Sequence, residues 1–240
     1  MGYTEIIRRK IGGGVPIKTL QFYPAGDSAL VVEFGQVIDE AINDRVHAMA
    51  GWVGQQRIRG VLEVLPTFRS LMIYYDPLRI SYDKLVKRIE TCPDFSDTRS
   101  MVEKKILEVP CCYDGPDLDS MEQLTGLTKE KIIEIHSGID YKIYMMGFLP
   151  GFVYLGGLDP RICAPRLETP RTRIEPGSVG IGGSQTGVYP VASPGGWRIL
   201  GYTPLKFYDP SRKDPILCKA GEYIRFIPIS RAEYERLVVR

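Results

Sequence analysis

The sequence is poor in the residues that build metal centres and disulfide frameworks. Its 240 residues include only two histidines and five cysteines, and no two cysteines form a CxxC pair. An odd, irregularly spaced set of thiols does not resemble a disulfide framework, and a zinc site needs more ligands than these residues offer together. We therefore expect no metal and a reducing compartment, which makes the cytoplasm the predicted location.

The sequence also lacks long apolar runs and a dominant charge. No stretch of about 18 apolar residues could span a bilayer, and the charged N-terminus has no apolar signal-peptide core. Lys and Arg total 31 against 29 Asp and Glu, a net charge of +2. Without a basic footprint, neither a nucleic-acid nor a membrane partner is expected. The Gly12–Gly14 run predicts a flexible N-terminal extension over residues 1–18.

Glycine and proline, by contrast, are abundant, and they concentrate between His136 and Pro204. The same stretch is rich in aromatic and aliphatic residues, too apolar for a disordered linker. Glycine allows unusual backbone conformations and close approach, while proline fixes φ. This density predicts short strands joined by tight turns, in a small β-barrel or sandwich whose loops form a binding surface.

The first part of the chain predicts a compact α+β sandwich domain over residues 19–92. Two apolar runs flank the turn dipeptide Gly26-Asp27 and predict a hairpin. Asp39 is positioned to cap a helix that ends near Gly54. A second pair of strands follows, and Ser81 is positioned to cap a second helix. The order ββαββα predicts one sheet with helices on one face.

A polar stretch over residues 91–99 predicts the domain boundary, and residues 100–240 form the second domain. A strand over 105–112 opens it, and two short helices follow. Thr128 is positioned to cap the second of these helices through its hydroxyl alone, because Lys131 cannot complete a capping box. After Tyr141 the pattern indicates strands and turns, until a last helical turn or two over 232–238.

Few residues in this barrel suggest chemistry by themselves. His136 ends a predicted helix, where an imidazole can cap the last carbonyls; alternatively it exchanges protons with a ligand in the Gly/Pro loops. The arginines Arg166, Arg171 and Arg173 stand on a proline-restricted segment, where they are either solvated or aimed at a carboxylate or phosphate. Trp197 either stacks on a ligand or fills the end of the barrel.

The glycine-rich segment 177–187 does not match the known phosphate motifs. It has no Lys-Ser or Lys-Thr after a GxxxxG frame, and no strand and helix suited to a dinucleotide fingerprint. It either presents N–H groups to an anion or forms tight hairpin turns. No GxSxG nucleophile elbow occurs in the chain.

Four motifs together resemble the family of 5-oxoprolinase B subunits, also known as allophanate hydrolase subunit 1, which includes a sporulation kinase inhibitor. They are GDSALVVEFG at 26–35, HSGIDYKIYMMGFLPGFVYLGGLDPR at 136–161, PRLETPRTRIEPGSVGIGGSQTGVYP at 165–190 and SPGGWRILGYTPLKFYDP at 193–210. The resemblance implies an α+β fold, with an N-terminal α+β domain followed by a C-terminal cyclophilin-like β-barrel.

The resemblance also implies a function within an assembly. Family members act with 5-oxoprolinase C and A subunits to hydrolyse the small cyclic amide 5-oxo-L-proline to L-glutamate, with ATP as cosubstrate and no metal inferred from this chain. The implied site lies between two barrels, so ATP would be shared with a partner. Two alternatives remain open: a non-catalytic inhibitor of a sporulation histidine kinase, and, ranked lower, a subunit for allophanate or urea hydrolysis.

The resemblance assigns the site to residues of the second domain. His136 and Arg171 are the implied catalytic residues, the first moving a proton and the second stabilising negative charge. The implied substrate- or nucleotide-binding residues are Tyr144, Gly147, Phe148, Pro150, Gly151, Ser184, Gln185, Thr186, Tyr189, Gly195 and Trp197. The sequence departs from the family pattern in two places: the glycine-rich loop is shortened to Tyr113-Asp114-Gly115, and Tyr202 replaces a basic residue. We expect both changes to alter the rim of the site.

Overall fold

The computed structural model describes residues 20–95 and 104–238. The chain divides into two units, Met1–Glu103 and Lys104–Arg240. The predicted extension over 1–18 and residues 96–99 of the predicted boundary lie outside the described residues. Within the described ranges, no helix has the length and apolar character needed to cross a membrane.

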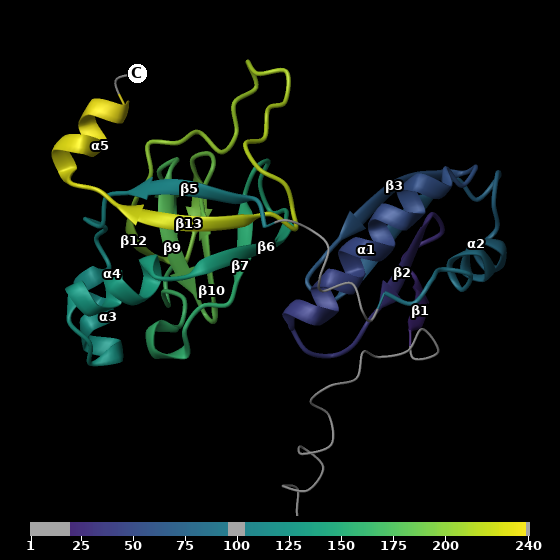
Figure 1. Ribbon diagram of the computed structural model, residues 1–240, viewed down its shortest axis with the longest axis horizontal. Helices are drawn as coiled ribbons and strands as arrows, with labels where there is room; N and C mark the ends of the chain where they lie inside the picture. Colours follow the sequence, from purple (N-terminus) through teal and green to yellow (C-terminus); the bar gives the residue numbers. More distant parts are fainter. Residues whose placement is uncertain (1–19, 96–103, 239–240) are drawn as a thin grey trace, which may run out of the picture. The chain divides into compact units, whose positions relative to one another are not determined.

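The first unit is a four-stranded antiparallel sheet with two helices (Figure 1). Its elements, in chain order, are β1 (Gln21–Pro24), β2 (Ala29–Glu33), α1 (Glu40–Gln56), β3 (Val61–Pro66), β4 (Ser70–Tyr75) and α2 (Tyr82–Ile89). The strands lie in the order β1-β2-β4-β3. The expected hairpin is the β1–β2 pair, in which Pro24 opposes Leu30. The ββαββα order is therefore confirmed.

Local signals explain where these helices begin and end. The Asp39 carboxylate accepts hydrogen bonds from the backbone N–H of Ala41 at 2.9 Å and of Ile42 at 3.1 Å, which caps α1. This helix continues to Gln56, past the expected end near Gly54, and stops where Arg57 adopts a left-handed φ of 46°. Ser81 precedes α2 as expected, although its side chain makes no cap hydrogen bond.

Both helices cover the same face of the sheet. Alternate residues of β2 and β4 point toward them, as the two-residue period of a strand requires. The resulting core includes Leu30, Val32, Val46, Met49, Leu71, Ile73, Leu85 and Ile89. The α+β sandwich predicted for this part of the chain is thus confirmed.

The second unit is built around a seven-stranded sheet of order β12-β9-β10-β7-β6-β13-β5 (Figure 1). Its elements, in chain order, are β5 (Ile106–Cys111), α3 (Leu118–Thr125), α4 (Lys129–Ser137), β6 (Asp140–Met146), β7 (Val153–Gly156), the 3₁₀ turn η4 (Pro160–Ile162), β8 (Arg171–Ile174), β9 (Ser178–Gly182), β10 (Gln185–Val188), β11 (Ser193–Gly195), β12 (Arg198–Tyr202), β13 (Tyr223–Pro228) and α5 (Arg231–Val238). The strands β8 and β11 form a separate pair.

The sheet curls until its two edge strands nearly meet. At the end of β5, Cys112 pairs with Tyr202 of β12 through two backbone hydrogen bonds of 2.9 Å. The chain then continues along β12, where the N–H of Gly115 donates to Leu200 O at 3.0 Å and that of Asp117 to Ile199 O at 3.2 Å. The shortened loop therefore closes the barrel. The predicted C-terminal β-barrel is confirmed as a nearly closed, barrel-like sheet.

The barrel interior and the two helices form one apolar core. Inward-facing residues of the strands meet Leu118, Met121, Ile132 and Ile135 of α3 and α4. The strand residues in this core include Val109, Tyr141, Ile143, Val153, Leu155, Val179, Ile181, Val188, Ile224 and Phe226. The core therefore fills the barrel and leaves the outer faces of β7, β9 and β10 available for other contacts.

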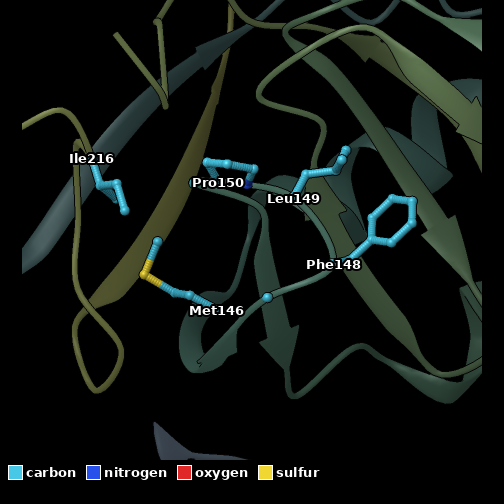
Figure 2. A pocket seen from close by; sticks show the side chains of 7 residues that line it. Met146, Phe148, Leu149, Pro150 and Ile216 are labelled. Carbon is cyan, nitrogen blue, oxygen red and sulfur yellow. The ribbon is translucent and has the colours of Figure 1, made fainter. Parts of the chain in front are cut away.

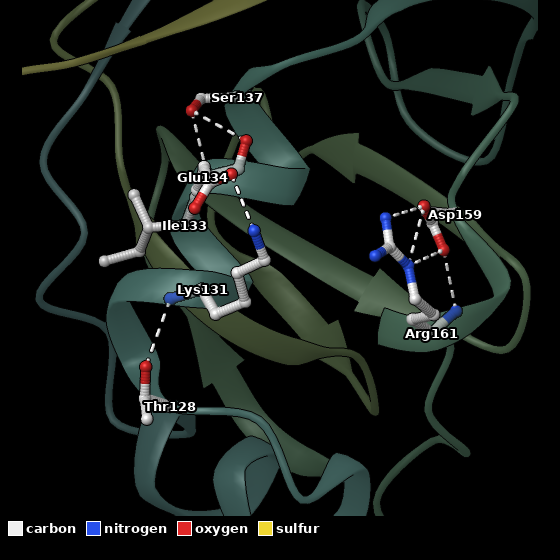
Figure 3. Close-up of polar contacts among 7 residues, drawn as sticks. All are labelled: Thr128, Lys131, Ile133, Glu134, Ser137, Asp159 and Arg161. Carbon is white, nitrogen blue, oxygen red and sulfur yellow. Dashed lines mark hydrogen bonds and ion pairs between the residues drawn. The ribbon is translucent and has the colours of Figure 1, made fainter.

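Polar contacts fix the chain around this core (Figure 3). The Thr128 hydroxyl accepts a hydrogen bond from the Lys131 N–H at 3.3 Å, which confirms the expected hydroxyl cap of α4. The η4 turn was not expected. It forms because Asp159 accepts a hydrogen bond from the Arg161 N–H at 2.9 Å and also pairs with the Arg161 guanidinium at 2.7 Å.

A matched pair of glycines tests how tightly the barrel backbone packs. Gly177 and Gly183 have similar left-handed φ values of 83° and 69°; an added Cβ would overlap Thr203 O at Gly177 but would meet nothing within 4 Å at Gly183. We expect Gly183→Ala to lower the free energy of unfolding by about 1–2 kcal/mol, the cost of the backbone conformation. Gly177→Ala should cost clearly more, measured by urea unfolding. Equal losses would show that Thr203 moves aside freely.

Candidate functional site

The outer face of the barrel carries glycines where aromatic rings come close. Because Val153, Val179, Ile181 and their neighbours point inward, the alternate residues Gly180, Gly182 and Gly187 face outward. A Cβ at Gly182 would overlap Trp197 Nε1, and one at Gly187 would lie 3.0 Å from another atom of the same indole. The glycine-rich segment therefore makes room for Trp197. Its strands β9 and β10 form a hairpin, one of the two readings left open above.

Trp197 belongs to a second, smaller apolar cluster on this outer face. We call it the aromatic cluster; its buried members are Phe152, Ile174, Tyr189, Trp197 and Ile199, with Leu149, Tyr154 and Tyr202 packed against them. The ring centroid of Phe152 lies 5.1 Å from that of Tyr189 and 5.4 Å from that of Trp197, both edge to face. This geometry favours attraction between rings and fixes the indole.

The β8–β11 pair places a charged residue beside this cluster. In this pair, Arg171 of β8 opposes Gly195 of β11. A Cβ at Gly195 would lie only 2.5 Å from the Tyr189 hydroxyl oxygen, so the strand approaches that tyrosine closely. Four of the implied site residues, Arg171, Tyr189, Gly195 and Trp197, thus lie together. The structure brings them to one surface, although it does not test their roles.

The sequence analysis missed the residue that holds Arg171. Asp117, 5% exposed, accepts a hydrogen bond from Arg171 Nη2 on one carboxylate oxygen at 2.7 Å and one from the Ile199 N–H on the other at 2.6 Å. The pKa of Arg171 is raised, first by this hydrogen bond. Asp117 and Arg171 are 54 residues apart, and an Asp before a helix resembles an ordinary N-cap. Nothing local in the sequence indicates the pairing.

The loop 147–151 forms a neighbouring apolar surface. Its residues, with Met146 and Ile216, line a shallow depression of about 310 Å³. Figure 2 shows Met146 and Ile216 on one side of Pro150, while the ring of Phe148 points to the other. Phe148 is 63% exposed and has a left-handed φ of 67°, a costly conformation for a bulky residue. Its ring meets Phe152 edge to face at 5.5 Å, next to the aromatic cluster.

The remaining implied binding residues lie apart from the aromatic cluster. Ser184 is exposed and Gln185 half-buried where β9 turns into β10. Tyr144 is nearly buried against Gly156, where a Cβ would overlap its ring. Thr186 is fully buried and points into the barrel. Across the described ranges, no three His, Cys, Asp or Glu side chains are grouped as a metal site would require.

His136 lies inside the barrel core and does not face the loops. Its Nδ1 is 2.7 Å from the Tyr113 hydroxyl and its Nε2 is 2.8 Å from the Thr186 hydroxyl. Thr186 donates its own proton to Gly180 O at 3.0 Å. It must therefore accept from Nε2–H, which leaves Nδ1 to accept from Tyr113. The ring also stacks on Phe226 at 4.7 Å between centroids.

This placement fits a structural role. Complete burial lowers the pKa of His136 to about 3, so the ring is neutral at physiological pH. Neither reading from the sequence describes this environment: the helix cap requires the last carbonyls, and proton transfer requires access to a ligand. Both ring nitrogens are instead used within the core, and we do not assign His136 a chemical step.

The buried imidazole predicts a specific dependence of stability on pH. The unfolded chain protonates His136 near its ordinary pKa of 6.5, whereas the folded chain resists protonation down to about 3. Between these values the unfolded state binds more protons, so the free energy of unfolding falls as pH decreases, by up to about 1.4 kcal/mol per pH unit. Urea unfolding of His136→Gln at pH 4 to 7 should show this part of the slope removed.

The same substitution at the other histidine provides the control. His47 is half-buried on α1. The His47→Gln variant should keep the His136 contribution to the slope. If His136→Gln and the unmodified chain showed the same slope, the folded imidazole would titrate normally and the buried assignment would be wrong.

Comparisons with known proteins agree with this fold. Residues 20–218 match the family described as carboxyltransferase domain, subdomain C and D. The B subunit of 5-oxoprolinase from Bacillus subtilis (strain 168) is 40% identical, with 89% of this chain and 95% of the relative covered. The solved structure of TTHA0988 has a TM-score of 0.76 at 33% identity; the match covers 84% of this chain but only 40% of that longer chain.

A more distant structure shows the fold alone. Kluyveromyces lactis urea carboxylase has a TM-score of 0.72 at 21% identity, with 92% of this chain and 22% of that chain covered. The aromatic cluster and the loop 147–151 both lie within the matched residues 20–218. The chain therefore belongs to the carboxyltransferase subdomain C and D family, within which it is closely similar to 5-oxoprolinase B subunits.

Proposed function

We propose that this chain is the B subunit of an ATP-dependent 5-oxoprolinase, which hydrolyses 5-oxo-L-proline to L-glutamate together with the C and A subunits. The observation that carries the proposal is the 40% identity to a protein of that name over 95% of its length. The Escherichia coli O157:H7 protein of the same name, 36% identical, supports it independently. The letter in the names of these relatives itself implies that other chains take part.

The proposed reaction needs an activated amide. Resonance makes the lactam carbonyl a poor electrophile, so the terminal phosphoryl group of ATP is first transferred to its oxygen, releasing ADP. Water attacks the ring carbon, and the C–N bond breaks as the nitrogen takes up a proton, which leaves an acyl phosphate. A second water releases phosphate and L-glutamate. Negative charge develops on oxygen during these steps, and fixed positive groups stabilise it.

Arg171 is the residue best placed for that role. Asp117 holds its guanidinium on one side, yet the side chain remains 31% exposed and keeps further N–H donors. The adjoining Trp197 and Tyr189 offer flat apolar surface for a small ring. We propose that these residues form one wall of the site and that a partner chain supplies the other wall and shares the bound ATP.

The exposed loop 147–151 supports a contact with the C subunit. Phe148 presents its ring at the surface from a strained backbone, beside an apolar depression. Large exposed aromatics at a protein surface commonly anchor an interface. The solved chain TTHA0988 is more than twice as long as this one, so in that relative further polypeptide accompanies the same fold. We propose that Phe148 binds the C subunit.

Replacing Phe148 tests this contact. Asn tolerates a left-handed φ better than Phe, so Phe148→Asn should fold normally while lacking the ring. We expect its affinity for the C subunit to fall about tenfold or more, measured by calorimetry or interferometry. Leu124→Asn is the control, because Leu124 is also an exposed apolar residue of this unit, on α3, and should bind normally. Unchanged affinity of Phe148→Asn would place the interface elsewhere.

Reconstitution tests the activity itself. The chain combined with the C and A subunits should release L-glutamate together with ADP, and omission of this chain should abolish both products. Arg171→Gln alone would leave Asp117 buried without its cation, so the informative variant is Asp117→Asn combined with Arg171→Gln. We expect this double variant to fold and assemble but to lose about 100-fold in kcat. Full activity of the folded double variant would remove Arg171 from the proposed chemistry.

A further inference from the structure

Three arginines of one short segment have very different surroundings. The Arg173 guanidinium is paired with Glu175 at 2.6 Å, and that of Arg171 with Asp117 at 2.7 Å. Arg166 is exposed and, among the residues that the structure describes, it makes neither an ion pair nor a hydrogen bond through its side chain. The segment therefore presents one uncompensated guanidinium.

The backbone that carries Arg166 is fixed on both sides. The carbonyl of Pro165 accepts a hydrogen bond from Arg198 Nε at 3.0 Å, and the N–H of Leu167 donates to Gly196 O at 2.7 Å. Arg198 is itself held by Ser120, whose hydroxyl oxygen is 2.9 Å from Arg198 Nη1. An arginine on such a backbone loses less freedom on binding than one on a loose loop. These contacts orient Arg166 before any ligand arrives.

Arg166 also stands beside the aromatic cluster. Its Cβ is 3.8 Å from the point where a Cβ on Gly196 would lie, and Gly196 directly precedes Trp197. Burial raises the pKa of both Tyr154 and Tyr189, and in each case the positive charge of Arg166 opposes this change. The charge of Arg166 therefore acts on two rings of the surface that we assign to the substrate.

We propose that Arg166 binds the carboxylate of the substrate. The substrate class is a small cyclic amide with one carboxylate, so this inference rests on the proposed function and deepens it. A guanidinium offers two parallel N–H donors that match a carboxylate, and nothing in the described structure competes for those of Arg166. Arg171 is less suited, because Asp117 already occupies its Nη2. Arg166 thus orients the ring while Arg171 stands near the reacting carbonyl.

The test uses the complex with the C and A subunits and compares Arg166→Gln, Arg166→Lys and the control Arg161→Gln. Arg161 is an exposed arginine five positions earlier, paired with Asp159. Loss of a charge-assisted hydrogen bond should raise the KM for 5-oxo-L-proline about 10- to 100-fold in Arg166→Gln. The kcat and the KM for ATP should stay within about threefold, because ground and transition states lose the same contact. Arg166→Lys should recover part of the affinity, and Arg161→Gln should match the unmodified complex.

A carboxylate-free probe separates this role from others. Inhibition by 2-pyrrolidinone, the same lactam ring without the carboxylate, should be equal for the unmodified complex and Arg166→Gln. An unchanged KM for 5-oxo-L-proline, a rise in the KM for ATP instead, a fall in kcat alone, or a failure of the variant to assemble would each overturn the proposal. The last three results would indicate, respectively, a phosphate contact, a role in the chemistry and a contact between chains of the complex.

Failure of the proposed function gives a different result. If the unmodified complex releases no glutamate, the 5-oxoprolinase assignment falls, and ligand-observed NMR with 5-oxo-L-proline then decides the role of Arg166. Binding to the unmodified complex but not to Arg166→Gln would still support a carboxylate site. Equal binding to both, or binding to neither, would overturn it.

Discussion

The two oxygens of the Asp117 carboxylate join the closure of the barrel to the candidate site. One oxygen accepts from the Ile199 N–H of β12, in the region where the segment after β5 closes the barrel, and the other holds Arg171 on β8. A buried carboxylate is costly unless it is paired and hydrogen-bonded, and here both conditions are met. The position of Arg171 therefore depends on barrel closure. The shortened loop 113–115, which the sequence suggested as a change at the rim, is part of that closure.

Glycines and aromatic rings complement one another on the outer face. Trp197 can lie against β9 and β10 only because Gly182 and Gly187 have no side chains there. A substitution at either position would displace the indole and disturb its edge-to-face contacts with Phe152. The glycine-rich segment is thus explained by close packing. Its backbone groups pair within the β9–β10 hairpin, so they do not form a phosphate loop.

Much of the fold could be predicted because its signals are local. The Gly26-Asp27 turn, the Asp39 and Thr128 caps and the alternating strand residues each act over a few positions. The site could be predicted only in part. The recognised motifs include Arg171, Tyr189 and Trp197, which the structure brings together. Asp117 was missed because its partners Arg171 and Ile199 are far away in sequence. His136 looked accessible because its burial depends on strands that follow it in the chain.

The surface of the second unit is costly for a chain that acts alone. A left-handed backbone at Phe148 costs about 1–2 kcal/mol, and it holds a phenyl ring in water, where the ring gains little. The uncompensated guanidinium of Arg166 stands near the same aromatic cluster. Strain, exposed apolar surface and an unpaired charge each favour a contact that completes them. Their joint presence around one cluster is therefore best understood if this chain supplies half of a site, with substrate and a sister protein supplying the contacts that it lacks.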